Sequence, residues 1–206
     1  QRQMCIRDSI YVLPYSSVNE IGLTSTLLVN TVATVGSITL LDLTDTSINI
    51  GWGQGSYSTV TIDWKNYNSS NTIYTSYGVS SYNITGLVSN KQYDITVYPN
   101  NSNYLAGAIP IGTPSLFSIV TYATIGYAFV NSFTDSTANL IWYGGTYNAI
   151  SIRWTDIFNN ANIINPDSSL SSYNITNLYP NTSNVFRIIP YNSANTLSFN
   201  NSFYTD

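Results

Sequence analysis

The sequence predicts an all-β protein made of tandem β-sandwiches, and three observations support that prediction. The phrase Tyr-Asn-Ile-Thr occurs at residues 82–85 and again 91 positions later at residues 173–176, which indicates a duplicated unit of domain length. Short runs of strand-forming residues recur about every 8–12 residues between Asn, Ser, Gly and Pro, a spacing typical of sandwiches and barrels. Apolar and polar residues alternate within these runs, and no helical period is present.

The repeat extends along both copies. When residue n is laid on residue n + 90, two tryptophans and a tyrosine align, and after one inserted residue a leucine and a proline align as well. The pairs are Trp52 and Trp142, Tyr57 and Tyr147, Trp64 and Trp154, Leu87 and Leu178, and Pro99 and Pro190. Because the match runs through both units, we interpret it as tandem duplication.

A partial third copy precedes the two full ones, since residues 11–17 resemble residues 187–193. We expect residues 10–35 to be the last two strands of a truncated repeat, residues 36–124 to be one full repeat and residues 125–206 another. Residues 1–9 fit neither the repeat nor its composition. They resemble translated sequencing-adapter read-through, so they are left out of the fold prediction.

Seven strands are expected in each full repeat. In the first they fall near residues 37–43, 46–52, 58–66, 71–76, 80–85, 92–98 and 116–123. In the second they fall near residues 127–133, 137–142, 148–155, 161–165, 171–176, 184–190 and 196–204. The partial copy contributes strands near residues 10–15 and 25–33.

Alternation identifies the side chains that face the core. In strands 46–52 and 58–66 the apolar residues share one face, and a slip of one position would expose them all. Tryptophan covers the largest area of any side chain, so we expect the tryptophans to dominate each core. The expected core positions are Trp52, Trp64, Leu87, Tyr93, Trp142, Trp154 and Leu178.

A Trp in the second strand, a Leu after the fifth and a Tyr six residues later resemble the fibronectin type III family. The resemblance covers residues 37–124 and 125–206, and the partial copy fits as the last two strands of the same fold. It implies seven-stranded, immunoglobulin-like sandwiches in which the Tyr hydroxyl bonds back to the preceding turn. Tyr93 matches that position, whereas the second repeat has Asn184 there and departs from the pattern.

The full repeats join at residues 123–126 with no flexible spacer, so a stiff junction is expected. Residues 103–114 form an apolar insertion between the last two strands of the first repeat. Loops at sandwich ends often carry binding functions. We weigh a seal over the neighbouring repeat against contact with a partner. The side chains that would serve either role are Leu105, Ile109 and Ile111.

Composition argues against several function classes. Charged residues make up only 8% of the chain and the net charge is −4. Nucleic acids and anionic membranes are both bound through basic residues, so neither is an expected partner. No apolar run approaches the roughly 18 residues of a membrane span, so no membrane insertion is expected. The chain has no His, and its single Cys lies within residues 1–9, so we expect no catalytic residue, no cofactor and no enzyme.

Thr-Asp occurs in equivalent turns at residues 44–45 and 134–135. An Asp in such a turn usually caps it through its own backbone. A calcium site built from Asp45 or Asp135 and backbone carbonyls is the alternative. Acidic residues do not cluster around either position, so no metal site is expected.

Two carbohydrate hypotheses remain. Exposed aromatic rings suit sugar binding, although tyrosines also cover half-buried sheet faces, which is the interpretation we favour. The aromatic candidates are Tyr67, Tyr74, Tyr77, Tyr143, Tyr147 and Tyr191. The glycan-acceptor pattern Asn-x-Ser/Thr arises easily by chance in a chain rich in Asn, Ser and Thr. It occurs at Asn68, Asn83, Asn100, Asn174, Asn181 and Asn200.

Sandwich edges are usually guarded by Lys, Glu or Pro, and here Asn, Ser and Thr stand there instead, which favours self-association. We therefore expect a structural or adhesive fibre or stalk protein at an extracellular, cell-surface or virion-surface location. Its expected partner is itself, as neighbouring repeats or subunits, with surface glycans or proteins as further partners. The alternative is a carbohydrate-binding accessory module of a larger secreted protein.

Overall fold

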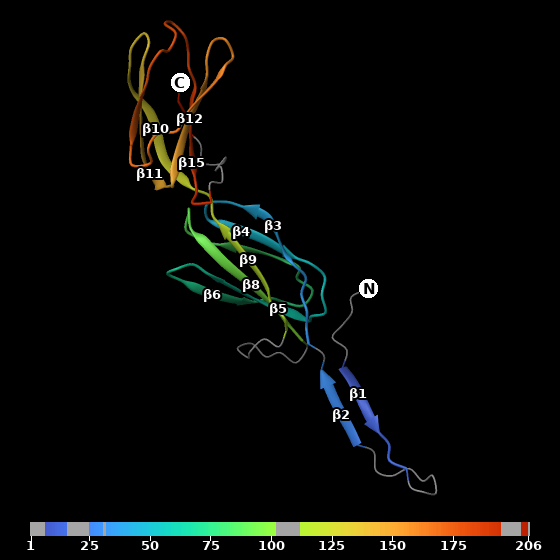
Figure 1. The fold of residues 1–206 in the computed structure, drawn as a ribbon. Coiled ribbons are helices and arrows are strands. Elements are labelled where there is room, and N and C mark those ends of the chain that lie inside the picture. The colour runs from blue at the N-terminus through green and yellow to red at the C-terminus, as the bar shows by residue number, and fades with distance from the viewer. Residues whose placement is uncertain (1–6, 16–24, 31, 102–111, 195–202, 206) are drawn as a thin grey trace. The chain divides into compact units, whose positions relative to one another are not determined.

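The computed structural model describes residues 7–15, 25–30, 32–101, 112–194 and 203–205. Every regular element in these ranges is a β-strand, which confirms the all-β prediction (Figure 1). The described ranges contain no helix that could cross a membrane. The chain forms two compact units. The first comprises residues 1–39, 50–82 and 94–117, and the second comprises residues 40–49, 83–93 and 118–206.

Strands in the first copy fall close to the predicted ranges. They are β3 (Ile38–Leu43), β4 (Ser47–Trp52), β5 (Thr59–Lys65), β6 (Ser70–Tyr74), β7 (Ser81–Thr85), β8 (Gln92–Asn100) and β9 (Ser115–Val120). They form a sheet in the order β3-β4-β7 and a second sheet in the order β6-β5-β8-β9.

Strands of the second copy repeat this arrangement. They are β10 (Thr124–Phe133), β11 (Ala138–Thr146), β12 (Ala149–Thr155), β13 (Ala161–Ile164), β14 (Ser172–Ile175), β15 (Phe186–Tyr191) and β16 (Phe203–Thr205). The sheets have the orders β10-β11-β14 and β13-β12-β15-β16, the same as in the first copy. The expected strand 196–204 lies mostly outside the described residues.

The partial copy contains an antiparallel hairpin of β1 (Arg7–Val12) and β2 (Ser25–Asn30), in which Arg7 lies opposite Asn30. The hairpin overlaps the strands expected near residues 10–15 and 25–33. β1 begins inside residues 1–9, so three residues of the segment that we set aside take part in strand pairing.

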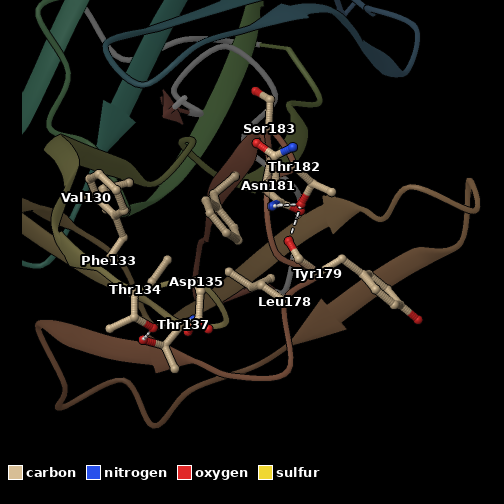
Figure 2. Close-up of a pocket in the computed structure, with 13 residues that line it drawn as sticks. Val130, Phe133, Thr134, Asp135, Thr137, Leu178, Tyr179, Asn181, Thr182 and Ser183 are labelled. Carbon is tan, nitrogen blue, oxygen red and sulfur yellow. Dashed lines mark hydrogen bonds between the residues drawn. The ribbon is translucent and has the colours of Figure 1, made fainter.

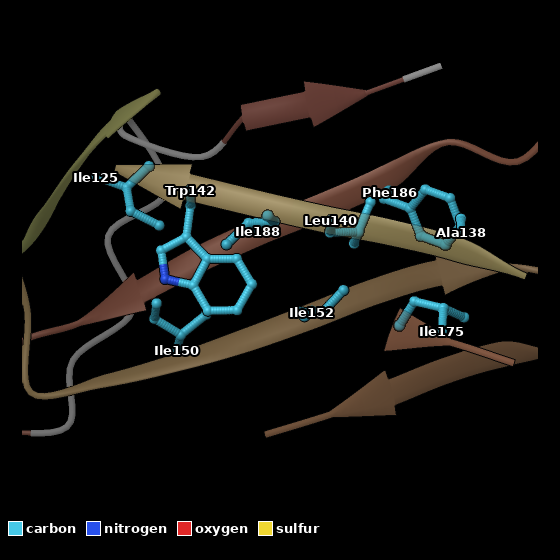
Figure 3. Close-up of a cluster of buried hydrophobic side chains, with 9 residues drawn as sticks. All are labelled: Ile125, Ala138, Leu140, Trp142, Ile150, Ile152, Ile175, Phe186 and Ile188. Atoms are coloured by element: carbon cyan, nitrogen blue, oxygen red, sulfur yellow. The ribbon is translucent and has the colours of Figure 1, made fainter. Parts of the chain in front are cut away.

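The core of the second copy lies between its two sheets. Nine buried apolar residues gather there around Trp142, which is fully buried (Figure 3). They are Ile125, Ala138, Leu140, Trp142, Ile150, Ile152, Ile175, Phe186 and Ile188. Burial of one tryptophan side chain contributes about 4–6 kcal/mol before conformational entropy is subtracted. Buried residues alternate with partly exposed ones along β11, and β12 contributes Ile150 and Ile152 from the same face. This alternation determines both the register and the core.

Eight of the nine equivalent positions are buried in the first copy, where Trp52 takes the place of Trp142. The exception is Val35, the equivalent of Ile125, which is half-buried. Each indole N–H donates a hydrogen bond to the tyrosine five residues later. The Trp52 Nε1 to Tyr57 Oη distance is 3.1 Å, and the Trp142 Nε1 to Tyr147 Oη distance is 3.3 Å. The repeat of Tyr57 and Tyr147 thus has a physical reason, because a buried indole donor needs an acceptor.

Four of the expected core residues are buried, namely Trp52, Leu87, Tyr93 and Trp142. The other three, Trp64, Trp154 and Leu178, are half-buried, and Trp154 and Leu178 pack against the buried core cluster of the second copy. Trp64 and Trp154 stand next to the last residues of β5 and β12, where the sheet no longer covers the whole ring. Trp154 still packs on Phe186 with ring centroids 5.8 Å apart.

Candidate functional site

The turn before β8 carries the tyrosine corner that the family resemblance implies. The Tyr93 side chain is buried, and its hydroxyl accepts a hydrogen bond from the backbone N–H of Val88 at 2.9 Å. The ring thereby fills the end of the first copy and satisfies a turn donor at once.

The second copy replaces this corner with smaller polar groups. Asn184 Nδ2 donates to Thr182 Oγ1 at 3.2 Å, and the Thr182 hydroxyl donates to the Tyr179 carbonyl at 2.6 Å. An Asn side chain is smaller than a Tyr ring, and Asn184 is one of the residues that line an open hollow of about 740 Å³ at this end (Figure 2). Leu178 and Phe186 line it, which explains why Leu178 is only half-buried.

The Thr-Asp turns beside each corner are capped by threonine, which corrects the expectation that Asp would cap them. Thr44 Oγ1 accepts the backbone N–H of Ser47 at 2.8 Å, and Thr134 Oγ1 accepts that of Thr137 at 3.0 Å. Asp135 Oδ1 instead accepts a hydrogen bond from the Ser136 hydroxyl at 3.1 Å. The residue before the Asp has the right reach, because its hydroxyl lies next to the donors that close the turn.

The segment after β9 lies in the second compact unit and is bound from two sides. Thr121 is fully buried, and its hydroxyl donates to the Val88 carbonyl at 2.8 Å. The same oxygen accepts the Lys91 N–H at 3.0 Å, and the Thr121 N–H donates to the Lys91 carbonyl at 3.0 Å. Thr121 therefore ties the chain to the turn at residues 88–91.

The turn at residues 192–194 binds the same segment from the other side. Asn192 is buried, and its Nδ2 donates to the carbonyl oxygens of Val120 at 3.3 Å and Thr121 at 3.2 Å. The backbone N–H of Ser193 donates to Asn90 Oδ1 at 3.0 Å. We call residues 192–194 the docking turn. Its contacts are neutral hydrogen bonds, so they do not depend on charge.

A group of exposed aromatic rings covers one end of the outer face of the β10-β11-β14 sheet. Tyr127 and Tyr143 lie opposite each other in the register of β10 and β11, and their ring centroids are 5.3 Å apart. Phe129 lies 6.2 Å from Tyr127 and 6.1 Å from Tyr143. All three are exposed, and we name them the aromatic face.

The first copy has no aromatic residue at the equivalent positions. Ser37 stands for Tyr127, Thr39 for Phe129 and Gly53 for Tyr143 in the n + 90 alignment. The aromatic face is therefore not required by the fold. Sequence reasoning named Tyr143 but missed Tyr127 and Phe129, whose proximity depends on the register of β10.

The other tyrosines named as carbohydrate candidates are not part of the aromatic face. Tyr147 accepts the Trp142 indole bond, and Tyr191 accepts a hydrogen bond from Arg153 Nη2 at 2.8 Å, so both have structural roles. Tyr67, Tyr74 and Tyr77 are exposed residues of the first copy, and Tyr67 is completely so.

The acceptor patterns fall into three groups. The side chains of Asn68, Asn83, Asn174 and Asn181 are exposed. Asn200 lies outside the described residues, as do Leu105, Ile109 and Ile111 of the inserted loop. Asn100 is only 1% exposed, and its Nδ2 donates to Thr61 Oγ1 at 2.9 Å. A buried amide that is already a donor cannot carry a glycan in this conformation, so the pattern at Asn100 is structural.

Chemistry that depends on clustered ligands finds no support in the described part of the chain, where no three His, Cys, Asp or Glu residues gather. Asp156 and Asp167 are the carboxyl groups with a lowered pKa. The Asn160 amide and the Ser169 hydroxyl, respectively, are the main causes, because each donates a hydrogen bond to the charged form. Both residues lie in turns, where Asp167 is exposed and Asp156 is half-buried.

Comparison with known proteins gives a fold and no sequence relative. No protein-family model matches the sequence, and no characterised protein matches it by sequence. A segment of two fibronectin type III domains from chicken tenascin matches with a TM-score of 0.57 and 14% identity, over 82% of this chain and 96% of that one. The chain therefore has a fibronectin type III-like fold, and the resemblance read from the sequence is confirmed.

Two further solved structures align less closely, each with a TM-score of 0.36. A fibronectin type III domain of human collagen XX has 19% identity, over 43% of this chain and 93% of that one. The FN1–FN3 domains of chicken CNTN1 have 13% identity, over 95% of this chain and 76% of that one.

Proposed function

We propose that this chain is a section of an extracellular structural or adhesive fibre built from tandem β-sandwiches. The observation that carries the proposal is the double attachment of Thr121. Its hydroxyl and N–H bond to the turn at residues 88–91, and its carbonyl accepts the Asn192 amide. A segment held on both sides is not a free linker, so it can transmit force along the chain. Each hydrogen bond contributes about 1 kcal/mol.

Surface chemistry supports a location outside the cell or on a virion. The low charge and the many Ser, Thr and Asn residues suit a surface that meets neutral polymers or other copies of itself. The absence of Cys beyond residue 5 means that cohesion depends on packing and hydrogen bonds alone.

Single-molecule pulling of the full chain tests the structural role. We expect two sharp unfolding steps, each releasing on the order of 80 residues or roughly 270–290 Å of chain. Asn192→Ala should add a small extension at low force before those steps, because the docking turn then releases Thr121. Ser193→Ala is the matched control, since Ser193 bonds through its backbone N–H. Gradual extension of the unaltered chain without steps would refute the proposal.

A second candidate function, carbohydrate binding, is favoured by the aromatic face. The planes of Tyr127 and Phe129 differ by only 13°, and those of Phe129 and Tyr143 by 29°. Tyr127 and Tyr143 are tilted by 36° to each other, and together the three exposed rings present a broad apolar surface to the C–H groups of a sugar ring. The residues on either side of it along β10 and β11 carry no charge, which suits a neutral polysaccharide better than an acidic one.

Electrophoresis of the full chain through gels containing neutral polysaccharides tests this second candidate. A variant with Tyr127, Phe129 and Tyr143 all changed to Ser should lose at least about tenfold in retardation, since each aromatic contact contributes about 0.5–1.5 kcal/mol. Its melting temperature should stay close to that of the unaltered chain, because the three rings are exposed. Tyr67→Ser is the control for an exposed tyrosine elsewhere. Equal retardation of all three proteins would exclude the aromatic face as the binding site.

A further inference from the structure

We propose that one end of the second copy, formed by residues 133–137 and 178–184, is a docking site for a further sandwich of the same sequence. We call these residues the 178–184 pole. The inference rests on the proposed tandem function and assigns to it the residues that make contact. The expected occupant is the docking turn of that further sandwich, which corresponds to residues 192–194 of this chain.

The second compact unit contains the template for this contact. There the turn at residues 88–91 meets the docking turn. Asn90 Oδ1 accepts the Ser193 N–H, and the Asn90 N–H donates to the Tyr122 carbonyl at 3.0 Å. The Tyr122 N–H in turn donates to the Thr44 carbonyl at 3.1 Å.

The 178–184 pole has the same backbone as that receiving turn. Asn181 aligns with Asn90, and both have a φ of 54°. Leu178 N–H donates to the Ser136 carbonyl at 2.9 Å, as Leu87 N–H does to the Thr46 carbonyl at 3.0 Å. The left-handed conformation fixes how the Asn side chain leaves the turn. The carboxamide of Asn181 is therefore carried on a turn of the same conformation as that of Asn90, and its side chain is exposed.

Apolar burial differs sharply between the two ends. Leu43 of the first copy is 8% exposed and lines a hollow together with Tyr122 and Ala194 of the docking turn. Its equivalent Phe133 is 80% exposed. Phe133 borders the hollow of about 740 Å³ that Asn184 also lines. An apolar surface of this kind, with a polar rim of Thr and Asn, marks an interaction site.

The docking turn fits this site in chemistry as well as in shape. It is neutral, and it offers the backbone donor and the small Ala194 side chain that the first copy already accommodates. The only charge on the 178–184 pole is that of Asp135, and Asp45 occupies the equivalent place in the first copy. The hydrogen bonds that a further sandwich would make at this end are therefore of a kind that the molecule already makes once.

The test uses the full chain with residues 119–206 added after Asp206. β16 pairs Thr205 with Phe186, so four positions further on, residue 209 lies opposite Thr182. Position 209 of the extended chain is the added Thr121, and Thr182 is the equivalent of Lys91, which Thr121 meets in the first copy. The added copy thus presents its docking turn in the register of the template.

Asn181→Gly is the decisive variant, because Gly keeps the positive φ while it removes the side-chain acceptor. In the extended chain we expect it to lower a melting temperature by about 4 °C or more, the equivalent of one hydrogen bond of about 1 kcal/mol. In the original chain the shift should stay below about 1 °C. Asn90→Gly should act in both chains, and Asn159→Gly, at another positive φ in an exposed turn, in neither. Phe133→Ser should likewise act only in the extended chain.

Equal shifts for Asn181→Gly in the two chains would overturn the inference. So would an extended chain that responds to Asn90→Gly but not to Asn181→Gly. If the added copy is nevertheless folded, that result would exclude only the docking site and would not contradict the proposed tandem function. An added copy that does not fold counts against both.

Discussion

Each copy has its own core with the same packing pattern, and the two copies differ at their surfaces. Trp52 and Trp142 are buried at the same position, and each bonds to a tyrosine five residues later. The corner residue is Tyr93 in one copy and Asn184 in the other, and the outer face carries Gly53 in one and Tyr143 in the other. The core is constrained by packing and tolerates little change. The corner and the outer face are not bound by that constraint, and there the two copies diverge.

A group of buried polar residues also differs between the two copies. In the first copy the Asn100 amide bonds to Thr61, while the buried Oδ1 atoms of Asn100 and Asp63 have no hydrogen-bond partner among the described residues. In the second copy Arg153 donates to Ser151 at 3.2 Å and to Tyr191 at 2.8 Å. Arg153 stands at the position of Asp63 and Tyr191 at that of Asn100, so a cation and a hydroxyl replace a carboxylate and an amide.

The largest expected effect breaks the core. Trp142→Ala should cost about 3–5 kcal/mol, enough to unfold the second copy, and Trp52→Ala should do the same to the first. Differential scanning calorimetry should then show the loss of one copy's unfolding enthalpy in each variant. If Trp142→Ala abolishes both transitions, the copies fold as one unit and the comparison must be redrawn. A midpoint unchanged within about 3 °C would refute the role of Trp142.

An intermediate effect exchanges the corner residues. Tyr93→Phe removes the acceptor of the Val88 N–H and should destabilise the first copy by about 1–2 kcal/mol, or several degrees in its melting temperature. Asn184→Tyr is the reciprocal change, and it should stabilise the second copy by about 1 kcal/mol because the ring fills part of the hollow. Thermal melts followed by tryptophan fluorescence measure both. A stabilising Tyr93→Phe would show that the corner is not needed.

The smallest effect compares two turns at low pH. Asp156 accepts the Phe158 and Asn160 N–H groups at 3.0 and 2.8 Å, and its equivalent Asn66 accepts those of Asn68 and Ser69 at 2.8 Å. Hydrogen bonds from Asn160 hold the Asp156 pKa below 3.8. The Asp156 turn is therefore stabilised at higher pH and loses that stabilisation as pH falls through the lowered pKa.

Amide chemical shifts recorded during an acid titration measure this difference. The Phe158 and Asn160 signals should move with a midpoint below 3.8, while the Asn68 and Ser69 signals stay still. Asp156→Asn should abolish the movement. Equal movement in both turns would mean that the titration reports a wider change.

Alternation and repetition were sufficient to predict the strands and the sandwich class, and the tyrosine corner was implied by the resemblance to fibronectin type III domains. Period-two patterns such as Ile48, Ile50 and Trp52 determine which face is buried, so the register follows from the residues themselves. Tyr93 could be assigned because its spacing from the preceding Leu is a local property of the chain.

The surfaces could not be predicted, because they depend on distances across strands. The aromatic face arises only when β10 and β11 pair with Tyr127 opposite Tyr143. Both strands are longer than predicted, since Thr124 pairs with Thr146 through a stretch that includes two glycines at positive φ. At Gly145 a Cβ would collide with the Thr124 carbonyl. The predicted strand ended at residue 142, before these glycines.

The phrase Tyr-Asn-Ile-Thr lies on β7 (Ser81–Thr85) and on β14 (Ser172–Ile175), which are edge strands of equivalent three-stranded sheets. Two edge strands with one sequence are interchangeable parts, so β14 could add to β4 during refolding and β7 to β11. Synthesis from the N-terminus removes this ambiguity, because the first copy can close its sheet before β14 exists. The order of synthesis thus adds information that two identical phrases lack.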